Sequence, residues 1–97
     1  MNQLTINFDQ RVRTPEGILF RELDGEAVML NLDDESYYGL DPVGTRMWIV
    51  LEASETIGQA HAQLLTEYDV DAGRLEADLI ELIQVLRKQG LVVVEEA

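Results

Sequence analysis

The chain has no cysteine among its 97 residues. A disulfide framework, a thiolate metal site and a thiol nucleophile are therefore all excluded. Basic residues are scarce as well, because seven lysines and arginines stand against nineteen acidic residues and leave a net charge of −12. Such a surface repels phosphate backbones and anionic lipid, so we expect no nucleic-acid or membrane partner, whereas a basic partner is attracted.

Long apolar runs are also missing. No stretch approaches the ~20 apolar residues that are needed to span a bilayer. The N-terminus lacks the charged segment and apolar run of an export signal. We therefore expect a cytoplasmic protein. An apolar content of 46% is enough for one modest core, so residues 1–97 are predicted to form a single domain.

The first half of the chain has the patterns of an antiparallel sheet. Ile18 to Leu23 and Glu26 to Leu32 are predicted strands, and the Asp24-Gly25 pair between them is favoured in two-residue hairpin loops. Asp33 to Glu35 predicts a second turn in preference to a cation site, because oxygen-ligand loops need a fuller pattern with a closing Glu. Ser36 to Leu40 is short and aromatic and is predicted to return as the third strand.

Both ends of the chain have weaker strand character. Apolar and polar residues alternate from Leu4 to Phe8, which predicts a short opening strand that stops in the polar stretch Asp9 to Glu16. Its pairing partner is not evident from the sequence. Leu91 to Val94 predicts a short closing strand before an acidic tail, Glu95-Glu96.

The second half of the chain has helical spacing. Asp41 is a helix-capping residue type and Pro42 suits the first helical position, so a first helix is expected from Pro42 to about Glu52. Thr56 and Gln59 have the spacing of a capping box, in which the Thr side chain bonds forward and the Gln reaches back. This pattern predicts a second helix from Ile57 to about Tyr68.

A third helix has the strongest apolar period. Asp71 is its expected cap, it is predicted from Ala72 to about Gln89, and Gly90 ends it. Its apolar stripe comprises Leu75, Leu79, Leu82, Ile83 and Leu86. The order of the elements predicts an α+β fold, a small winged-helix-like domain with an N-terminal three-stranded antiparallel sheet followed by a three-helix bundle.

Charge argues against the use of this fold on DNA. A recognition helix presents several basic side chains to the duplex. The third helix is balanced instead: its charged residues are Glu76, Asp78 and Glu81 with Arg74, Arg87 and Lys88. We therefore expect no DNA binding through this helix.

The residue types of catalysis are few. His61 is the only histidine, and without a serine or acid at a recognisable spacing it is expected to be an exposed helix residue. Ser36 and Ser54 lack the Asp-Ser-Leu context of an acyl carrier protein. The sequence therefore predicts no catalytic residue, no metal site and no cofactor, and the chain is not expected to be an enzyme.

An ordered series of fold signals runs through the chain. It comprises Tyr37 to Asp41, Gly44, Trp48, Leu51, Thr56-Ile57, Tyr68 to Asp71, Asp78 and Gly90-Leu91. This series, spread over Ile18 to Val94, resembles the PqqD family, the small precursor-peptide recognition elements (peptide chaperones) of ribosomally made, modified peptides that include pyrroloquinoline quinone and lasso peptides. Asp41 departs from the Asn expected in most members, and Asp caps a helix equally well.

The resemblance implies a binding site. In this family the leader of a precursor peptide adds as an extra strand to the third strand and lies in the groove between that strand and the last helix. Carried over, the strand residues are Ser36, Tyr37, Tyr38, Gly39 and Leu40, and the helix residues are Asp78, Leu79, Ile80, Leu82, Ile83, Leu86 and Arg87. A sheet edge suits this role on physical grounds, because its unpaired N–H and C=O groups accept another extended chain.

The sequence leaves open which flank of the third helix faces the strand. Ile80 falls about 140° from Leu75 on a helical wheel, on the flank of Arg87, while Asp78 and Val85 border the opposite edge. Ile80 is thus either a scattered surface residue or a wall of the groove. Trp48 and Leu82 are predicted to belong to the structural core, because each lies at helical spacing with other apolar residues.

We therefore predict a free-standing recognition element that binds a precursor leader peptide and presents it to a modifying enzyme, such as a leader peptidase, a cyclase or a radical enzyme. The alternative is an acidic winged-helix module for protein interaction or dimerisation, of the transcription-adaptor type, with no role in peptide maturation. Titration with a leader peptide would separate the two.

Overall fold

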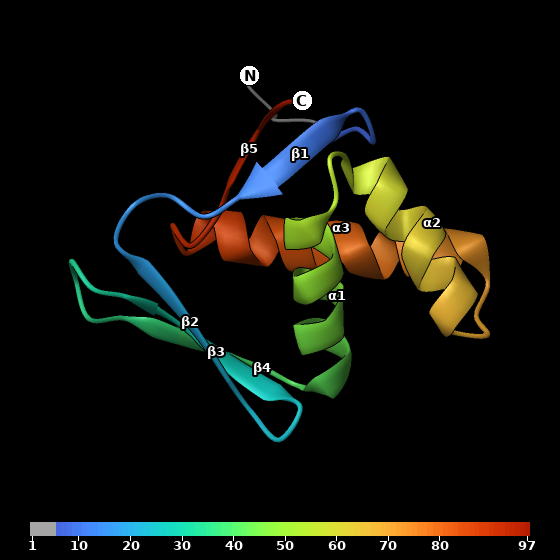
Figure 1. The fold of residues 1–97 in the computed structure, drawn as a ribbon. Coiled ribbons are helices and arrows are strands. Elements are labelled where there is room, and N and C mark those ends of the chain that lie inside the picture. The colour runs from blue at the N-terminus through green and yellow to red at the C-terminus, as the bar shows by residue number, and fades with distance from the viewer. Residues whose placement is uncertain (1–5) are drawn as a thin grey trace.

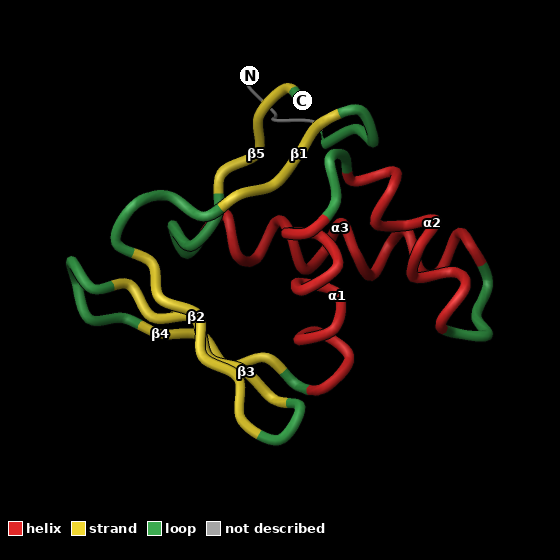
Figure 2. Tube along the Cα trace, in the orientation of Figure 1, coloured by secondary structure: helices red, strands yellow, loops and turns green. Residues whose placement is uncertain are grey.

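The computed structural model describes residues 6–97 as two small antiparallel sheets packed beside three helices (Figure 1). The elements are β1 (Gln10–Arg13), β2 (Ile18–Leu23), β3 (Glu26–Asn31), β4 (Tyr37–Leu40), α1 (Pro42–Ala53), α2 (Ile57–Glu67), α3 (Ala72–Lys88) and β5 (Val93–Glu96). The larger sheet has the order β2-β3-β4 and the smaller one pairs β1 with β5. Figure 2 shows the two sheets as separate groups of strands joined by a loop. The predicted α+β architecture is confirmed.

Local turn chemistry produces the β2-β3-β4 meander. Asp24 and Gly25 both have positive φ, at 57° and 84°, as a tight two-residue hairpin requires. In the second turn the Ser36 N–H donates to Asp34 Oδ1 at 2.9 Å, and the Ser36 hydroxyl donates to the same oxygen at 2.7 Å. These two bonds lower the pKa of Asp34. Both turns lie where the sequence predicted them.

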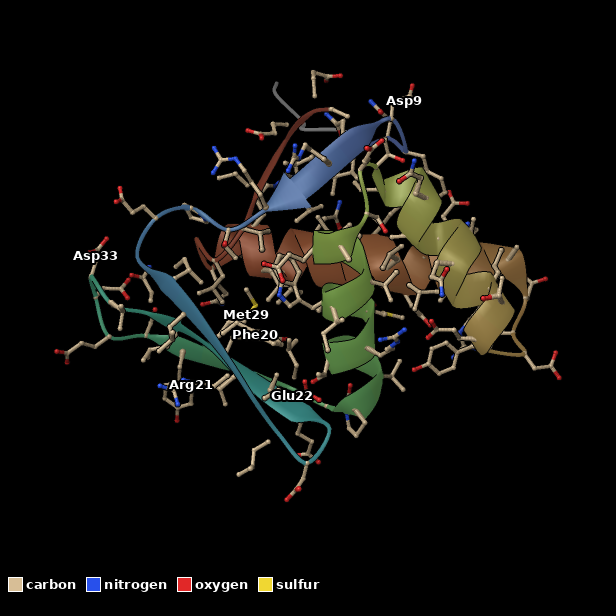
Figure 3. The ribbon with its side chains drawn as sticks, in the orientation of Figure 1. Asp9, Phe20, Arg21, Glu22, Met29 and Asp33 are labelled. Atoms are coloured by element: carbon tan, nitrogen blue, oxygen red, sulfur yellow. The ribbon has the colours of Figure 1, made fainter. Side chains whose placement is uncertain are left out.

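The two faces of this sheet have different surroundings. The register places Phe20 opposite Met29 and Met29 opposite Tyr38, so these three share one face. Figure 3 shows Phe20 and Met29 on the side that faces the helices, with Arg21 on the opposite side. Met29 is completely buried, whereas Tyr37 on the other face is 72% exposed. One face therefore belongs to the core and the other is open.

The opening strand lies later in the chain than the sequence predicted. Leu4 lies outside the described residues, and the next part of the predicted strand, through Phe8, is not strand. Phe8 contacts α2 instead, since its carbonyl accepts the N–H of Gly58 at 3.0 Å and its ring lies 5.1 Å from that of His61. Alternation alone does not make a strand without a partner for its backbone groups.

The strand forms in the polar segment that follows, because β5 supplies the missing partner. Arg11 lies opposite Glu95, and the Arg13 Nε atom is 2.9 Å from Glu95 Oε2. The predicted acidic tail, Glu95-Glu96, is therefore part of β5. The predicted start of the closing strand, Leu91-Val92, is buried in the core just before β5.

The helix caps follow the sequence closely. Asp41 Oδ1 accepts the Gly44 N–H at 2.7 Å, and Asp71 Oδ2 accepts the Arg74 N–H at 3.1 Å. Gly90 has a φ of 76° and ends α3 as predicted.

The capping box before α2 differs from expectation in one bond. Thr56 Oγ1 accepts the Gln59 N–H at 3.1 Å, as predicted. The Gln59 side chain, however, accepts the N–H of Glu55 at 2.9 Å instead of that of Thr56.

Polar contacts join the helices around one core. Arg46 of α1 donates to both carboxylate oxygens of Glu67 in α2, at 2.7 and 2.6 Å, and this pairing lowers the pKa of Glu67 to about 2. His61 Nε2 lies 3.0 Å from the carbonyl of Ala72, and because a carbonyl only accepts, that nitrogen carries the proton.

Trp48 is fully buried, as predicted. None of the helices in residues 6–97 is long and apolar enough to cross a membrane.

Candidate functional site

The far edge of β4 has free backbone groups. Within the described residues β4 pairs only with β3. The Asn31 N–H donates to the carbonyl of Ser36 at 2.8 Å, which makes this a hydrogen-bonded pair of the ladder. Bonded and non-bonded pairs alternate in an antiparallel ladder, so Met29 and Tyr38 form the next bonded pair. Tyr37 and Gly39 therefore direct their N–H and C=O groups away from β3.

A groove of about 400 Å³ lies between this strand, the start of α1 and the middle of α3. Its lining residues are Tyr38, Gly39, Leu40 and Asp41 from the strand and its end, Val43, Gly44 and Met47 from α1, and Asp78, Glu81, Leu82 and Val85 from α3. The strand edge and the groove thus adjoin each other.

The residues that line the groove show which flank of α3 faces β4. Asp78, Glu81, Leu82 and Val85 follow the spacing i, i+3, i+4, i+7, which is one stripe of a helix. This is the edge that Asp78 and Val85 border, away from Ile80.

The other helix residues named from the sequence lie elsewhere. Leu79, Ile83 and Leu86 are 0% exposed and form the core. Ile80 is partly buried against that core and does not line the groove, and neither does Arg87. Ile80 is thus neither a free surface residue nor a groove wall.

Leu82 lies at the border between the buried core and the groove. It was predicted as a core residue, but it is only partly buried against the core and it also lines the groove. Neither Glu81 nor Val85 was predicted as a site residue. They lie one and two helical turns after Asp78 on the same face, so the helical spacing that starts at Asp78 includes both.

The groove is acidic. Three carboxylates line it, from Asp41, Asp78 and Glu81, and none of its lining residues is Lys, Arg or His. The Asp41 carboxylate caps α1, and the Asp78 carboxylate is 3.6 Å from Arg74 Nε. Glu81 forms no ion pair with any residue of the described range. The site therefore keeps much of its negative charge.

A second hollow, of about 500 Å³, opens on the outer face of the same strand. Gly39 contributes to both cavities, and here it lies beside Leu23 and Val28. A Cβ atom at Gly39 would meet nothing within 4 Å. Leu23 and Val28 are 78% and 40% exposed. The absent side chain at position 39 thus leaves apolar surface open on that face.

The side chains of Ser36, Ser54 and His61, which were considered for catalysis, form hydrogen bonds within the protein. The Ser54 hydroxyl donates to the carbonyl of Val50 at 2.7 Å, and the Ser36 hydroxyl is bonded to Asp34. His61 bridges α2 to the start of α3. Across residues 6–97 no three His, Asp or Glu side chains gather in a way that could hold a metal ion.

Comparison with known proteins matches this chain to one family model. The model for coenzyme PQQ synthesis protein D (PqqD) matches residues 26–92, which include β3, β4 and all three helices. None of the curated proteins matches the chain.

Two solved structures are similar to most of this chain. TbiB1 in complex with the TbiA(β) leader peptide has a TM-score of 0.77 at 30% identity, covering 82% of this chain and 93% of that one. A lasso peptide synthetase B1 complexed with the leader peptide also has a TM-score of 0.77, at 20% identity, covering 86% of this chain and 98% of that one. The second likeness shows the fold alone.

Proposed function

The chain belongs to the PqqD family, and from that premise we propose that it is a precursor-peptide recognition element. It binds the leader of a ribosomally made precursor peptide and presents that peptide to a separate modifying enzyme. The leader pairs with β4 as a fourth strand and lies in the groove between β4 and α3. The chain itself performs no chemistry.

The observation that carries this proposal is the open edge of β4 beside the groove. Outward backbone groups at Tyr37 and Gly39 offer two donors and two acceptors to an incoming extended chain. A new strand continues a sheet at a spacing of about 4.8 Å, and its side chains alternate between the two faces. Every second side chain of the peptide therefore points into the groove, and the others lie over the hollow at Gly39.

One of the two similar solved structures supports leader binding. TbiB1, which is 30% identical to this chain, is in complex with a leader peptide. The family model spans both walls of the groove, from β3 through α3.

Binding of this kind is a balance of moderate terms. Two buried apolar anchors contribute about 1.5 to 3 kcal/mol each. Ordering a disordered leader costs about 2 to 5 kcal/mol. Main-chain hydrogen bonds add to the favourable side, so micromolar or tighter affinity is expected. Once the leader is held, the core peptide is tethered near the enzyme, and the reaction gains from a raised effective concentration.

The test is a titration that separates main-chain pairing from side-chain contact. The ligand is a fluorescein-labelled leader of a ribosomally made precursor peptide, and the readout is anisotropy. Gly39→Pro removes an outward N–H, whereas Gly39→Ala keeps it and adds a methyl group where nothing lies within 4 Å. The parent and the alanine variant should bind alike, and the proline variant at least tenfold more weakly with an unchanged thermal melt.

A folded proline variant that binds like the parent would overturn strand addition at β4. The dimerisation alternative gives a different result. In that case the peptide fails to bind the parent, and light scattering shows a concentration-dependent dimer that Gly39→Pro disrupts.

A further inference from the structure

We infer that the peptide taken by this groove carries a Lys or Arg side chain on the face turned toward α3, two residues away from an apolar side chain on the same face. The inference rests on the proposed function, because it specifies the peptide that the groove accepts. Its basis is the arrangement of charge and apolar surface along α3.

The carboxylates of the groove are not neutralised by the protein itself. Among residues 6–97, Asp41 is engaged only by a backbone N–H, at the cap of α1. Asp78 has one cationic partner in the same range, Arg74, and the two side chains are 47% and 76% exposed, so their attraction is weak. Glu81 has no ion-pair partner in residues 6–97. A cation that entered the groove would therefore meet net negative charge.

Along the stripe the two acidic residues come before the two apolar ones, with Glu81 and Leu82 adjacent in the sequence. Asp78 lies one turn before Leu82, and Glu81 lies one turn before Val85. The N-terminal half of the stripe is thus acidic and the C-terminal half is apolar. Four residues of helix advance about 6 Å, at 1.5 Å per residue.

A paired strand presents side chains at a matching interval. Side chains on one face recur every second residue, about 6.7 Å apart. For a peptide strand that runs along α3, one basic and one apolar side chain at positions i and i+2 reach the acidic and the apolar residues of the stripe together. The intervening side chain points to the outer face, over Gly39.

General attraction by net charge differs from recognition by the carboxylates of the groove. The chain has a net charge of −12, so any basic peptide is attracted from a distance. Attraction of that general kind weakens equally whichever carboxylate of the chain is removed. Recognition in the groove depends on which carboxylate is removed, because Asp78 and Glu81 are the acidic residues on the part of α3 that lines it.

The experiment is a selection on the full chain. Random twelve-residue peptides displayed on phage are selected on the parent, and only those that require the outward N–H are kept, by counter-selection on Gly39→Pro. We expect the retained peptides to be enriched in Lys or Arg two positions from Leu, Ile, Val or an aromatic residue. Three of them are then synthesised with fluorescein and titrated by anisotropy.

Two substitutions on the same helix provide a matched comparison. Glu81→Gln and Glu76→Gln each remove one negative charge, but Glu76 is exposed outside the groove. We expect Glu81→Gln to weaken binding by about threefold to fivefold. Glu76→Gln should bind like the parent, and a change from 50 to 300 mM salt should remove most of the difference between the two.

Each other outcome has a definite meaning. Retained peptides without basic enrichment, or with equal affinity for the parent and Glu81→Gln, overturn the inference and leave strand addition standing. Equal weakening by Glu76→Gln and Glu81→Gln assigns the attraction to net charge and overturns it as well. If no selected peptide distinguishes Gly39→Pro from Gly39→Ala, the proposed function itself fails.

Discussion

Two stripes of α3 show how one helix serves both stability and binding. The residues Leu75, Leu79, Ile83 and Leu86 are at most 3% exposed and belong to the core that also includes residues of the sheet, α1 and α2. The stripe that lines the groove, with Asp78, Leu82 and Val85 among its members, lies against no other element on its open side. Both stripes have helical spacing, so the period of the sequence does not show which one is core and which one lines the groove. What separates them is the mixture of carboxylates with apolar residues.

The difference has a physical reason. A buried carboxylate without a partner is too costly for a core stripe, so an acidic residue within an apolar period marks the boundary of the core. Apolar residues beside such a position are then free to contact a ligand. On α3 this boundary runs between Leu79 and Asp78.

The largest effect that we predict tests the buried stripe. Leu79→Ala should lower the free energy of unfolding by about 2 to 5 kcal/mol, because it opens a cavity among side chains with no exposed surface. Urea denaturation followed by circular dichroism measures this. Leader affinity, measured well below the melting temperature, should stay within a factor of about two of the parent. A large loss of affinity in a folded Leu79→Ala chain would contradict the division into two stripes.

The second prediction compares two neighbouring residues of β4. Tyr38 directs its N–H to β3 and its side chain to the core, so Tyr38→Pro should damage the sheet and lower the melting temperature. Tyr37 directs its N–H outward, so Tyr37→Pro should keep the fold and weaken leader binding by more than tenfold. Tyr37→Ala is the control for the lost side chain, and it should weaken binding less than proline does.

Anisotropy titrations with thermal melts on all three variants decide this prediction. If the two proline variants both stay folded and both bind like the parent, the leader does not pair with β4. If Tyr37→Pro unfolds and Tyr38→Pro does not, the alternation of bonds along β4 is opposite to that deduced from Asn31 and Ser36.

How far the sequence could predict this site depends on the kind of signal. The helix ends at Asp41 and Gly90 and the turn at Asp24-Gly25 were predicted correctly, because each depends on a few adjacent residues. β1 was predicted in the wrong place, because it forms by pairing with β5, whose residues lie 80 to 86 positions further along the chain. The direction of the β4 donors also needed the register with β3, which no local pattern contains.

The third prediction concerns Leu82, which lies on the border between the stripes. It is only partly buried, so Leu82→Ala should cost about 1 kcal/mol of stability, less than a fully buried leucine. Its contact with a leader side chain is lost at the same time, and affinity should fall about fivefold to tenfold. Val85→Ala provides a comparison, since that residue lines the groove one turn further along. Unchanged affinity in Leu82→Ala, with a loss of stability like that of Leu79→Ala, would place Leu82 wholly in the core.

The smallest effect that we predict comes from a carboxylate that stabilises the fold and takes no part in the groove. Arg46 donates two hydrogen bonds to Glu67 and lowers the pKa of that carboxyl to about 2, from an ordinary value of 4.5. A carboxyl whose pKa is lowered by folding binds fewer protons in the native state than in the unfolded state between these two values. Its stabilising contribution is therefore complete above pH 4.5 and is lost as the pH falls toward 2.

Glu67→Gln should thus melt at a lower temperature than the parent at pH 7, and the two melting curves should converge as the pH falls from 4.5 toward 2. Circular dichroism melts at half-unit intervals of pH measure the convergence. Leader affinity at pH 7 should be unchanged, because Glu67 does not line the groove, whereas Glu81→Gln should show the reverse pattern of weaker binding at unchanged stability. A difference between Glu67→Gln and the parent that persists to pH 2 would mean that the Arg46 pairing is not its source. Weaker leader binding by Glu67→Gln would mean that the groove extends beyond the residues assigned to it.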